Sequence, residues 1–312
     1  VTPCTNPIVT PMCNAMFALK GANAIIFTPH HRSFNSSTHT VNLINDELSR
    51  LGAPENIVQI LDVQSRENTR ELMASSDVVI ATGGMGMVRA AYSSGRPAFG
   101  VGAGNVQCII DRDVAFSEAV PKIIAGRSFD NGIICSSEQS VIVHNEDYES
   151  VMAEFENNKC YVVKSLAEAD ALRKVVFPEG KMNPELVGQP AFKAAAIAGI
   201  ELPEETKVLL VPAEGAGNKD LFSKEKMCPV LSVYTYNDFS EAVEIAAANL
   251  AYEGSGHSVA IHSDNTVNIE AAALKLNVSR FVINQTSSTS AGGSFFNGFS
   301  PTTTLGCGSW GN

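Results

Sequence analysis

The stretch DVVIATGGMG occupies residues 77–86 and decides the fold class. Its first half is a short apolar run with two adjacent valines and an isoleucine, which predicts a buried strand at 77–81. The glycines that follow predict a tight turn into a helix, where backbone N–H groups can receive a pyrophosphate. The third glycine of the usual dinucleotide motif is missing, because Arg89 stands in its place. A structural turn and a cofactor loop are therefore both open interpretations of this motif.

The same alternation of strands and helices extends to both sides of this stretch. Upstream, strands are predicted at 24–27 and 57–61 and helices at 41–51 and 67–74, so three strand–helix units follow one another. This order predicts a parallel, doubly wound α/β domain that binds a nucleotide.

A second α/β series follows the glycine-rich turn at 100–105. Its strands are predicted at 108–110, 140–143, 207–211, 258–261 and 281–283, its helices at 148–155 and 240–250, and a Ser/Thr/Gly loop at 286–294. We therefore expect two doubly wound α/β domains, a nicotinamide-cofactor domain at 1–106 and a catalytic domain at 107–312, with the active site in the cleft between them.

The composition excludes several classes of protein. The chain has 312 residues and 45% of them are hydrophobic, which fills two cores and excludes a disordered or fibrous protein. A net charge of −11 without a Lys/Arg cluster argues against nucleic acid as a partner. No apolar run approaches the roughly 20 residues that cross a bilayer, so no membrane partner is expected.

The cysteines and the chain ends carry further expectations. Seven cysteines without metal-ligand spacing cannot all pair with one another, which indicates reduced thiols in a cytoplasmic enzyme and no metal site. The chain starts at Val1 without Met, and both ends read as though the protein continues, so we expect the sequence to be incomplete.

Cys135 is the candidate nucleophile. It lies in the polar stretch DNGIICSSEQ at 130–139, at a predicted turn between a helix and a strand. A thiolate is the strongest side-chain nucleophile near neutral pH, and a thiol among backbone donors is readily activated. The alternative for any cysteine is burial in a core, which is our interpretation of Cys108 in its isoleucine-rich strand.

The turn after the first predicted strand is a candidate for cofactor recognition. Its sequence, TPHHR at 28–32, has no Asp or Glu to bind a ribose 2′-hydroxyl. Two histidines and an arginine would instead tolerate the 2′-phosphate of NADP. A solvated basic loop is the alternative interpretation.

Several strings of sequence carry a family resemblance: TNP at 5–7, TGG at 82–84, SGRP at 94–97, GVGAGN at 100–105, FDNG at 129–132, SSEQS at 136–140, GH at 256–257 and LGCGSWG at 305–311. With them the chain resembles the aldehyde dehydrogenase superfamily, and more closely its CoA-acylating branch. Within the branch it is most similar to the dehydrogenases of succinate semialdehyde, through PMCNAM at 11–16, KMCPV at 226–230 and PTTT at 301–304.

The resemblance implies a role for each matching residue. Cys135 matches the nucleophile, and Asn6 matches the amide that, with the Cys135 N–H, stabilises the oxyanion. Glu225 matches a carboxylate that contacts the nicotinamide ribose, and His257 recurs in the acylating branch. Without the family, Asn6 would be interpreted as a capping side chain, Glu225 as a solvated charge and His257 as a neutral, hydrogen-bonded ring. The predicted cofactor-binding residues are Thr28, Pro29, His31, Arg32, Thr82, Gly83, Gly84, Gly102 and Glu225.

One departure from the superfamily bears on the reaction. Hydrolytic members carry a glutamate in the glycine-rich turn to activate water, and the matching position here is Val101. Without that base the acyl-enzyme would persist until a thiol arrives, which favours coenzyme A. We therefore expect the reversible conversion of an aldehyde, CoA and NADP or NAD into acyl-CoA and reduced cofactor, by a homo-oligomer acting on small molecules only.

Succinate semialdehyde is the expected substrate, and serines at 136, 137, 287 and 288 together with Thr286 could donate hydrogen bonds to its distal carboxylate. The alternatives are acetaldehyde, propionaldehyde or sulfoacetaldehyde, a hydrolytic aldehyde dehydrogenase, and a non-catalytic nucleotide-binding module.

Overall fold

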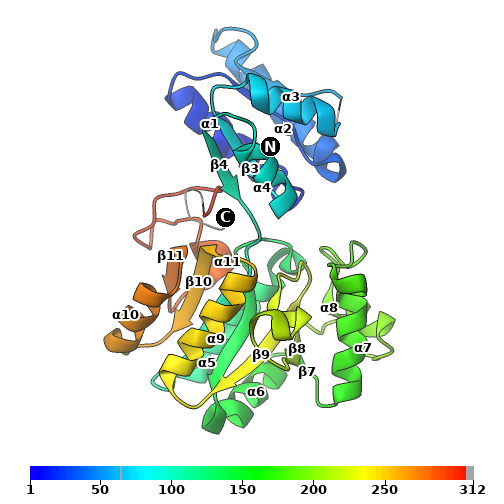
Figure 1. The fold of residues 1–312 in the computed structure, drawn as a ribbon, viewed down its shortest axis with the longest axis vertical. Coiled ribbons are helices and arrows are strands. Elements are labelled where there is room, and N and C mark those ends of the chain that lie inside the picture. Colours follow the sequence, from blue (N-terminus) through cyan, green and yellow to red (C-terminus); the bar gives the residue numbers. More distant parts are fainter. Residues whose placement is uncertain (64, 307–312) are drawn as a thin grey trace. The chain divides into compact units, whose positions relative to one another are not determined.

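A computed structural model describes residues 1–63 and 65–306 and divides them into two compact units (Figure 1). The first unit comprises residues 1–102 and 301–306, and the second comprises 103–300. The boundary expected between residues 106 and 107 falls inside strand β5 (Val106–Ile110), whereas the two units divide between residues 102 and 103. Cys307 and the rest of the family string at 307–311 lie outside the described residues.

The first unit alternates strands and helices as its sequence predicts. Its elements are α1 (Val9–Lys20), β1 (Ile25–Phe27), α2 (Phe34–Arg50), β2 (Val58–Ile60), α3 (Arg66–Ser75), β3 (Val79–Thr82), α4 (Met85–Tyr92) and β4 (Ala98–Val101). All of the strand–helix units predicted between residues 24 and 92 are present, and the elements differ from the predicted ranges by a few residues at their ends, except that α2 begins seven residues earlier.

The strands of this unit form two parallel pairs, β1 with β2 and β3 with β4, and residues Val1 and Thr2 lie between the pairs. The Val1 amino group donates to the carbonyl oxygen of Ile80 at 2.7 Å, while the Thr2 N–H donates to the carbonyl oxygen of Thr28 at 3.2 Å. The pairs are therefore linked side by side in the order β2, β1, Val1–Thr2, β3, β4.

Helices cover the two faces of this arrangement. Strand connections between parallel strands are right-handed, so α2, which leads from β1 outward to β2, and α4, which leads from β3 outward to β4, lie on opposite faces. Helix α1 packs on α2 around Ala15, Phe27 and Val41, whereas α3 and α4 pack around Met73 and Ala91. The unit is thus doubly wound about the Val1–Thr2 segment.

The second unit is built on one parallel sheet of seven strands in the order β11-β10-β5-β6-β9-β8-β7. Its strands are β5, β6 (Glu138–His144), β7 (Tyr161–Val162), β8 (Leu209–Pro212), β9 (Val230–Tyr236), β10 (Gly256–His262) and β11 (Val278–Ile283). Its helices are α5 (Phe116–Ser128), α6 (Tyr148–Asn157), α7 (Leu166–Val176), α8 (Ala191–Ile197), α9 (Phe239–Tyr252), α10 (Thr266–Lys275) and α11 (Ser287–Ser290).

This sheet is also doubly wound, which confirms the predicted α/β class. Helices α5 and α6 connect strands in one direction along the sheet and α9 and α10 in the other, so right-handed connections place the two pairs on opposite faces. Figure 1 shows α9 running along the strands of the sheet, where it packs on Ile109, Ile142 and Tyr234.

One local prediction was wrong. Residues 287–290 were expected within a loop but form the short helix α11, which packs on α5. Three of its serines are buried, and Ser287 donates its N–H to a buried carboxylate of β6, so tertiary contacts override the weak helix propensity of serine and threonine.

The length and apolar character of the described helices bear on whether one of them could span a bilayer. Over the residues that the structure covers, none of them combines the length and the apolar character that crossing a membrane requires.

Candidate active site

The amino ends of four adjacent strands bring the predicted catalytic and cofactor-binding residues of the second unit to one edge of its sheet. Cys135 precedes β6, Glu225 precedes β9, and His257 is the second residue of β10. Gly104 lies two residues before β5, the strand between β10 and β6. Residues that are up to 153 positions apart in the chain therefore share one edge because the parallel strands are hydrogen-bonded side by side.

Cys135 lies in a tight loop that crosses the backbone at Gly104. A Cβ atom added to Gly104 would overlap the carbonyl group of Cys135, so only glycine permits this approach. Upstream of Cys135, Asp130 and Asn131 have positive φ angles of 48° and 51°, and Gly132 follows with a φ angle of 70°. This left-handed turn ends the α5 region and directs the chain back toward the start of β6.

Cys135 is half-buried as a residue, and the surrounding protein removes much of the solvation of its thiol. This burial, together with the Glu225 carboxylate, raises the pKa of the thiol to about 12. The backbone N–H groups of Cys135 and Ser136 oppose the rise of this pKa, since they favour the thiolate. In this state the sulfur is a protonated thiol at neutral pH, and its reactivity depends on what lowers that pKa.

Glu225 is half-buried, and its Oε1 accepts the Gly104 N–H at 3.0 Å. Burial and the neighbouring Glu253 carboxylate raise the pKa of Glu225 to about 7, against the Gly104 N–H and the positive charges of Arg127 and Lys226. The Glu225 N–H donates to Glu253 Oε2 at 2.7 Å, which holds the two acidic residues together. The interpretation of Glu225 as an isolated solvated charge does not fit this environment.

His257 is fully buried, and its Nδ1 lies 2.7 Å from the hydroxyl of Ser258. Burial lowers the pKa of His257 to about 4, so the ring is neutral at neutral pH. Its Nε2 has no hydrogen-bond partner among the described residues. The neutral, hydrogen-bonded ring that we weighed as an alternative matches this description, and a catalytic role for His257 stays a prediction.

The predicted nucleotide residues of the first unit gather at the carboxyl ends of β1 and β3. Residues 28–32 follow β1, and Thr82 ends β3 with Gly83 and Gly84 after it, on either side of the Val1–Thr2 segment where the winding reverses. Such a switch point is where open α/β sheets bind ligands. Gly84 caps α4 with no side-chain hydrogen bond, which leaves the first N–H groups of α4 open to an anion.

The glycines of this turn are not required by packing. A Cβ atom on Gly84 or on Gly86 would meet no atom within 4 Å, and one on Gly83 would only touch Met87 at 3.9 Å. Absence of a side chain here therefore leaves room above the backbone, as close approach of a phosphate requires. This favours the cofactor-loop interpretation over a purely structural turn. Thr82 is buried, and its hydroxyl has no partner among the described residues.

The TPHHR turn divides into buried and exposed parts. Thr28 is buried and its hydroxyl lies 3.1 Å from that of Thr69, and Pro29 is buried as well. His31 and Arg32 are exposed, and the ring of His31 lies 4.2 Å from that of His30. Direct contact with a nucleotide is therefore open to His31 and Arg32 more than to the side chains of Thr28 and Pro29.

Asn6, Val101 and Gly102 also belong to the first unit. Asn6 accepts the Thr5 hydroxyl at 2.8 Å, and the residue that caps α1 is Ile8, without a side-chain hydrogen bond, so a capping role for Asn6 is not observed. Val101 is 1% exposed at the end of β4, and Gly102 is buried next to it. A carboxylate at position 101 would have to enter the core of this unit.

Sequence reasoning missed a buried polar network beneath Cys135. Asn105 donates its amide to the carbonyl oxygens of Ser223, Asn249 and Glu253, and so ties the turn at Ser223 and the end of α9 to the start of β5. Glu138 and Arg127 are fully buried close by. Nothing in the sequence marked these residues for burial, because Glu138 stands in a polar stretch and Asn105 in the glycine-rich turn, where polar side chains are expected to be solvated.

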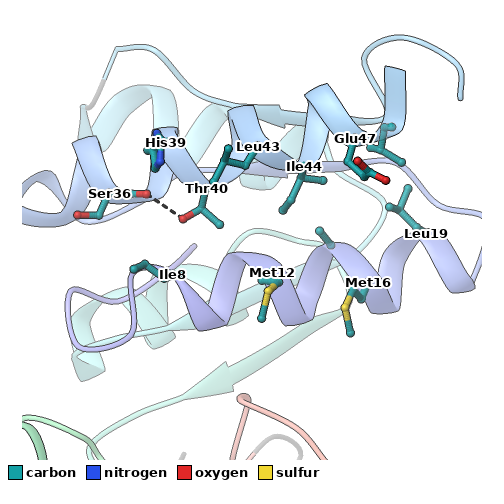
Figure 2. A pocket seen from close by; sticks show the side chains of 12 residues that line it. Ile8, Met12, Met16, Leu19, Ser36, His39, Thr40, Leu43, Ile44 and Glu47 are labelled. Atoms are coloured by element: carbon teal, nitrogen blue, oxygen red, sulfur yellow. Dashed lines mark hydrogen bonds between the residues drawn. The ribbon is translucent and has the colours of Figure 1, made fainter. Parts of the chain in front are cut away.

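An apolar groove elsewhere on the first unit has a different character. It lies between α1 and α2, has a volume of about 540 Å³, and is lined mainly by Ile8, Met12, Met16, Leu43 and other apolar side chains (Figure 2). It contains none of the predicted cofactor residues, and its apolar lining does not suit a phosphate-bearing ligand.

Comparison with known proteins identifies the family. The model of the aldehyde dehydrogenase family matches residues 1–168 and 211–304. The chain is 56% identical over 310 residues to a succinate-semialdehyde dehydrogenase (acetylating) of Clostridium kluyveri, a match that covers 99% of this chain and 68% of that relative.

Solved structures of aldehyde dehydrogenases are also similar to this chain. An acetylating aldehyde dehydrogenase from Geobacillus thermoglucosidasius superposes with a TM-score of 0.94 at 35% identity, over 98% of this chain and 68% of that one. A propionaldehyde dehydrogenase from Rhodopseudomonas palustris, solved with bound CoA and an acylated cysteine, superposes with a TM-score of 0.89 at 29% identity, over 98% and 69%.

The chain belongs to the aldehyde dehydrogenase family, and the predicted resemblance is confirmed.

Proposed function

We propose that the complete protein is a CoA-acylating aldehyde dehydrogenase, which converts an aldehyde, CoA and NAD(P)+ into acyl-CoA, NAD(P)H and a proton. The observation that supports it most is the environment of Cys135: a half-buried residue in a tight loop against Gly104, whose N–H donates to the neighbouring Glu225 carboxylate. Cys108, by contrast, is fully buried within strand β5.

The chemistry follows from a thiolate at Cys135. The sulfur attacks the aldehyde carbon, and the carbonyl π electrons move to oxygen to give a thiohemiacetal anion. The predicted donors to this anion are the Cys135 N–H and the Asn6 amide. When bound, the nicotinamide accepts the hydride that leaves the same carbon, and the product on the protein is a thioester at Cys135.

The turn at 100–105 favours CoA over water as the group that accepts the acyl group from the thioester. The turn at 100–105 contains no carboxylate, and Val101 is buried in the core of the first unit. Without a base positioned there to activate water, the thioester persists until the CoA thiolate attacks its carbonyl carbon and expels the Cys135 thiolate. Regeneration of Cys135 completes the cycle.

The cofactor would be held at the carboxyl ends of β1 and β3. The pyrophosphate would lie on Gly83 and Gly84 at the start of α4, with Thr82 and Gly102 beside this turn. His31 and Arg32 would contact the adenosine ribose, where an arginine suits the 2′-phosphate of NADP. Glu225 would contact the nicotinamide ribose. These assignments allow NADP and NAD, and they favour NADP.

Succinate semialdehyde is the proposed substrate. The hydroxyl groups of Ser137, Ser287 and Ser288 are buried without hydrogen-bond partners among the described residues. Buried hydroxyls without partners are unfavourable unless a ligand satisfies them, and a distal carboxylate would do so. Acetaldehyde, propionaldehyde and sulfoacetaldehyde are the competing substrates.

The proposed partners are small molecules, the aldehyde and CoA, in a cytoplasmic homo-oligomer. Cys13, Cys108, Cys135, Cys160 and Cys228 form no disulfide in the described part of the chain, which supports a reducing compartment. The exposed side chains of Phe295 and Phe296 support a contact with another subunit.

The test is Cys135→Ala in the complete protein, assayed with succinate semialdehyde, CoA and NADP and in the reverse direction with succinyl-CoA. Both activities should fall below about one per cent of wild type, because loss of a covalent nucleophile costs several orders of magnitude. Cofactor binding, measured by fluorescence titration, should survive.

Cys108→Ala is the matched control, because this cysteine is buried in β5. It should lower the melting temperature more than the turnover. Retained turnover in Cys135→Ala would rule out the proposed function.

A further inference from the structure

The loop that carries Cys135 is held on two sides. On one side, the Lys226 N–H donates to Gln139 Oε1 at 2.8 Å. On the other, the Ser136 hydroxyl donates to the carbonyl oxygen of Ser288 at 3.2 Å, and the Ser287 N–H donates to Glu138 Oε1 at 2.7 Å. Two of the three residues after Cys135, Ser136 and Glu138, are therefore linked to α11, which lies about 150 residues further along the chain.

Glu138 is the least expected member of these links. It is the first residue of β6, it is fully buried, and its carboxyl group rests on Gly126 of α5, where a Cβ atom would overlap it. Arg127 is the neighbouring cation, but its guanidinium donates to the carbonyl oxygens of Lys226 and Cys228. A buried carboxyl group is costly, so its position calls for an explanation beyond packing.

The same environment keeps Glu138 largely uncharged. Burial raises its pKa to about 8, against the Ser287 N–H, its own N–H and the charge of Arg127. A neutral carboxyl group still accepts the Ser287 N–H through its carbonyl oxygen. The contact therefore does not require an ionised group, and an amide of the same shape should replace it.

We propose that Glu138 is a positioning residue for Cys135: by accepting the Ser287 N–H, it clamps the nucleophile's loop onto α11. The inference rests on the proposed role of Cys135 and extends it. Cys135 lies in the loop that Ser136 and Glu138 fasten to α11, and Glu138 anchors that loop three residues from the nucleophile. Without the clamp the loop can shift, and a displacement of about 1 Å at a reacting atom costs about a hundredfold in rate.

The two sides of the contact can be removed separately. Glu138→Ala removes the acceptor. Ser287→Pro removes the N–H at the first position of α11, where proline is tolerated and where the preceding residue, Thr286, already has an extended backbone with ψ of 118°. Glu138→Gln keeps an acceptor of the same length. Ser287→Ala keeps the N–H and separates loss of the hydroxyl from loss of the donor.

Two readouts are needed, both on the complete protein. The first is the rate at which iodoacetamide alkylates Cys135, followed by peptide mass spectrometry, which needs no aldehyde or CoA. The second is kcat and the KM for NADP. Glu138→Ala and Ser287→Pro should each lower kcat and the alkylation rate at least tenfold, with the KM for NADP within about twofold of wild type.

Rescue and coupling distinguish positioning from general destabilisation. Glu138→Gln should stay within about threefold of wild type, and Ser287→Ala should lie closer to wild type than to Ser287→Pro. The double variant Glu138→Ala/Ser287→Pro should be no worse than the worse single variant, because both remove one interaction. Asp111→Asn is the matched control: this buried carboxylate accepts hydrogen bonds from Ser263 and Asn268 at the opposite end of β5.

The possible outcomes distinguish failure of the Glu138 clamp from failure of the proposed function. If Glu138→Ala retains kcat and alkylation while Cys135→Ala is inactive, the clamp is refuted and the proposed function stands. If Asp111→Asn lowers kcat as much as Glu138→Ala does at equal loss of melting temperature, the role of Glu138 is only structural and the proposal is overturned. If Cys135→Ala remains active, the proposed function itself has failed.

Discussion

Two ionisable side chains set the reactivity of Cys135. The thiol has a pKa of about 12 and the neighbouring Glu225 a pKa of about 7, and in both cases burial is the main cause. Above pH 7 the ionised Glu225 opposes formation of the thiolate, because two negative charges then share a poorly solvated site. Before a ligand is bound, Glu225, which is matched to cofactor binding, therefore also lowers the reactivity of Cys135.

We predict that Glu225→Gln accelerates alkylation of Cys135 by iodoacetamide at pH 8.5. Removal of the negative charge lowers the thiol pKa, and each unit of pKa is worth about tenfold in thiolate. At pH 5.5, where Glu225 is protonated in the wild type, the same substitution should have little effect.

Peptide mass spectrometry of Cys135 measures these rates. Glu205→Gln, in an exposed loop before β8, is the control and should not change them. An equal acceleration at both pH values would contradict the electrostatic explanation.

We infer that the turn between β1 and α2 decides the choice between NADP and NAD. Its buried part, Thr28 and Pro29, continues β1, while His31 and Arg32 project at the carboxyl end of the strand. No Asp or Glu occurs from Phe27 to Arg32, so the turn presents no charge that would repel a 2′-phosphate.

We therefore expect NADP to be used at least as well as NAD, and Arg32→Glu to reverse the preference. The KM for NADP should rise by about ten- to a hundredfold, which corresponds to loss of a hydrogen bond to a charged group, while the KM for NAD changes little. Steady-state kinetics with both cofactors measures the two KM values. Arg50→Glu, at the other end of α2, is the control; a preference for NAD that Arg32→Glu leaves unchanged would disprove the assignment.

At the level of the complete protein, the absence of a carboxylate in the turn at 100–105 predicts a stalled reaction without CoA. The structure adds that Val101 is buried, so a base cannot be supplied at this position without disturbing the core of the first unit. The acyl-enzyme should form at Cys135 and then wait for a thiol.

The expected outcome is a rapid burst of NADPH, equal to the number of enzyme sites, followed by almost no turnover until CoA is added. Stopped-flow absorbance measures the burst, and intact-protein mass spectrometry should find the acyl group on Cys135. Continuous turnover without CoA, at a rate similar to that with CoA, would show that another residue activates water and that the acylating function is wrong.

Much of the fold and of the candidate site could be predicted from local sequence. The run at 77–81 and its glycines, the other strand–helix alternations and the polar setting of Cys135 all depend on neighbouring residues, whose backbone preferences and periodicity act over short distances. Family resemblance added roles for Asn6, Glu225 and His257, which their own surroundings in the sequence did not indicate. The prediction of a loop at 286–294 was wrong at residues 287–290, because α11 is stabilised by contacts with α5 and Glu138 and not by the helix propensity of its own serines.

The strand order of the second unit could only come from the tertiary structure. Pairing of β10, β5, β6 and β9 places Gly104, Cys135, Glu225 and His257 on one edge, and hydrogen bonding between strands that are distant in sequence decides that order. The same packing buries Glu138, Glu225 and His257 and thereby shifts their pKa values. Solvation depends on every atom nearby, whatever its place in the chain, so the sequence by itself determined which groups are present and only the folded structure decided which of them are charged.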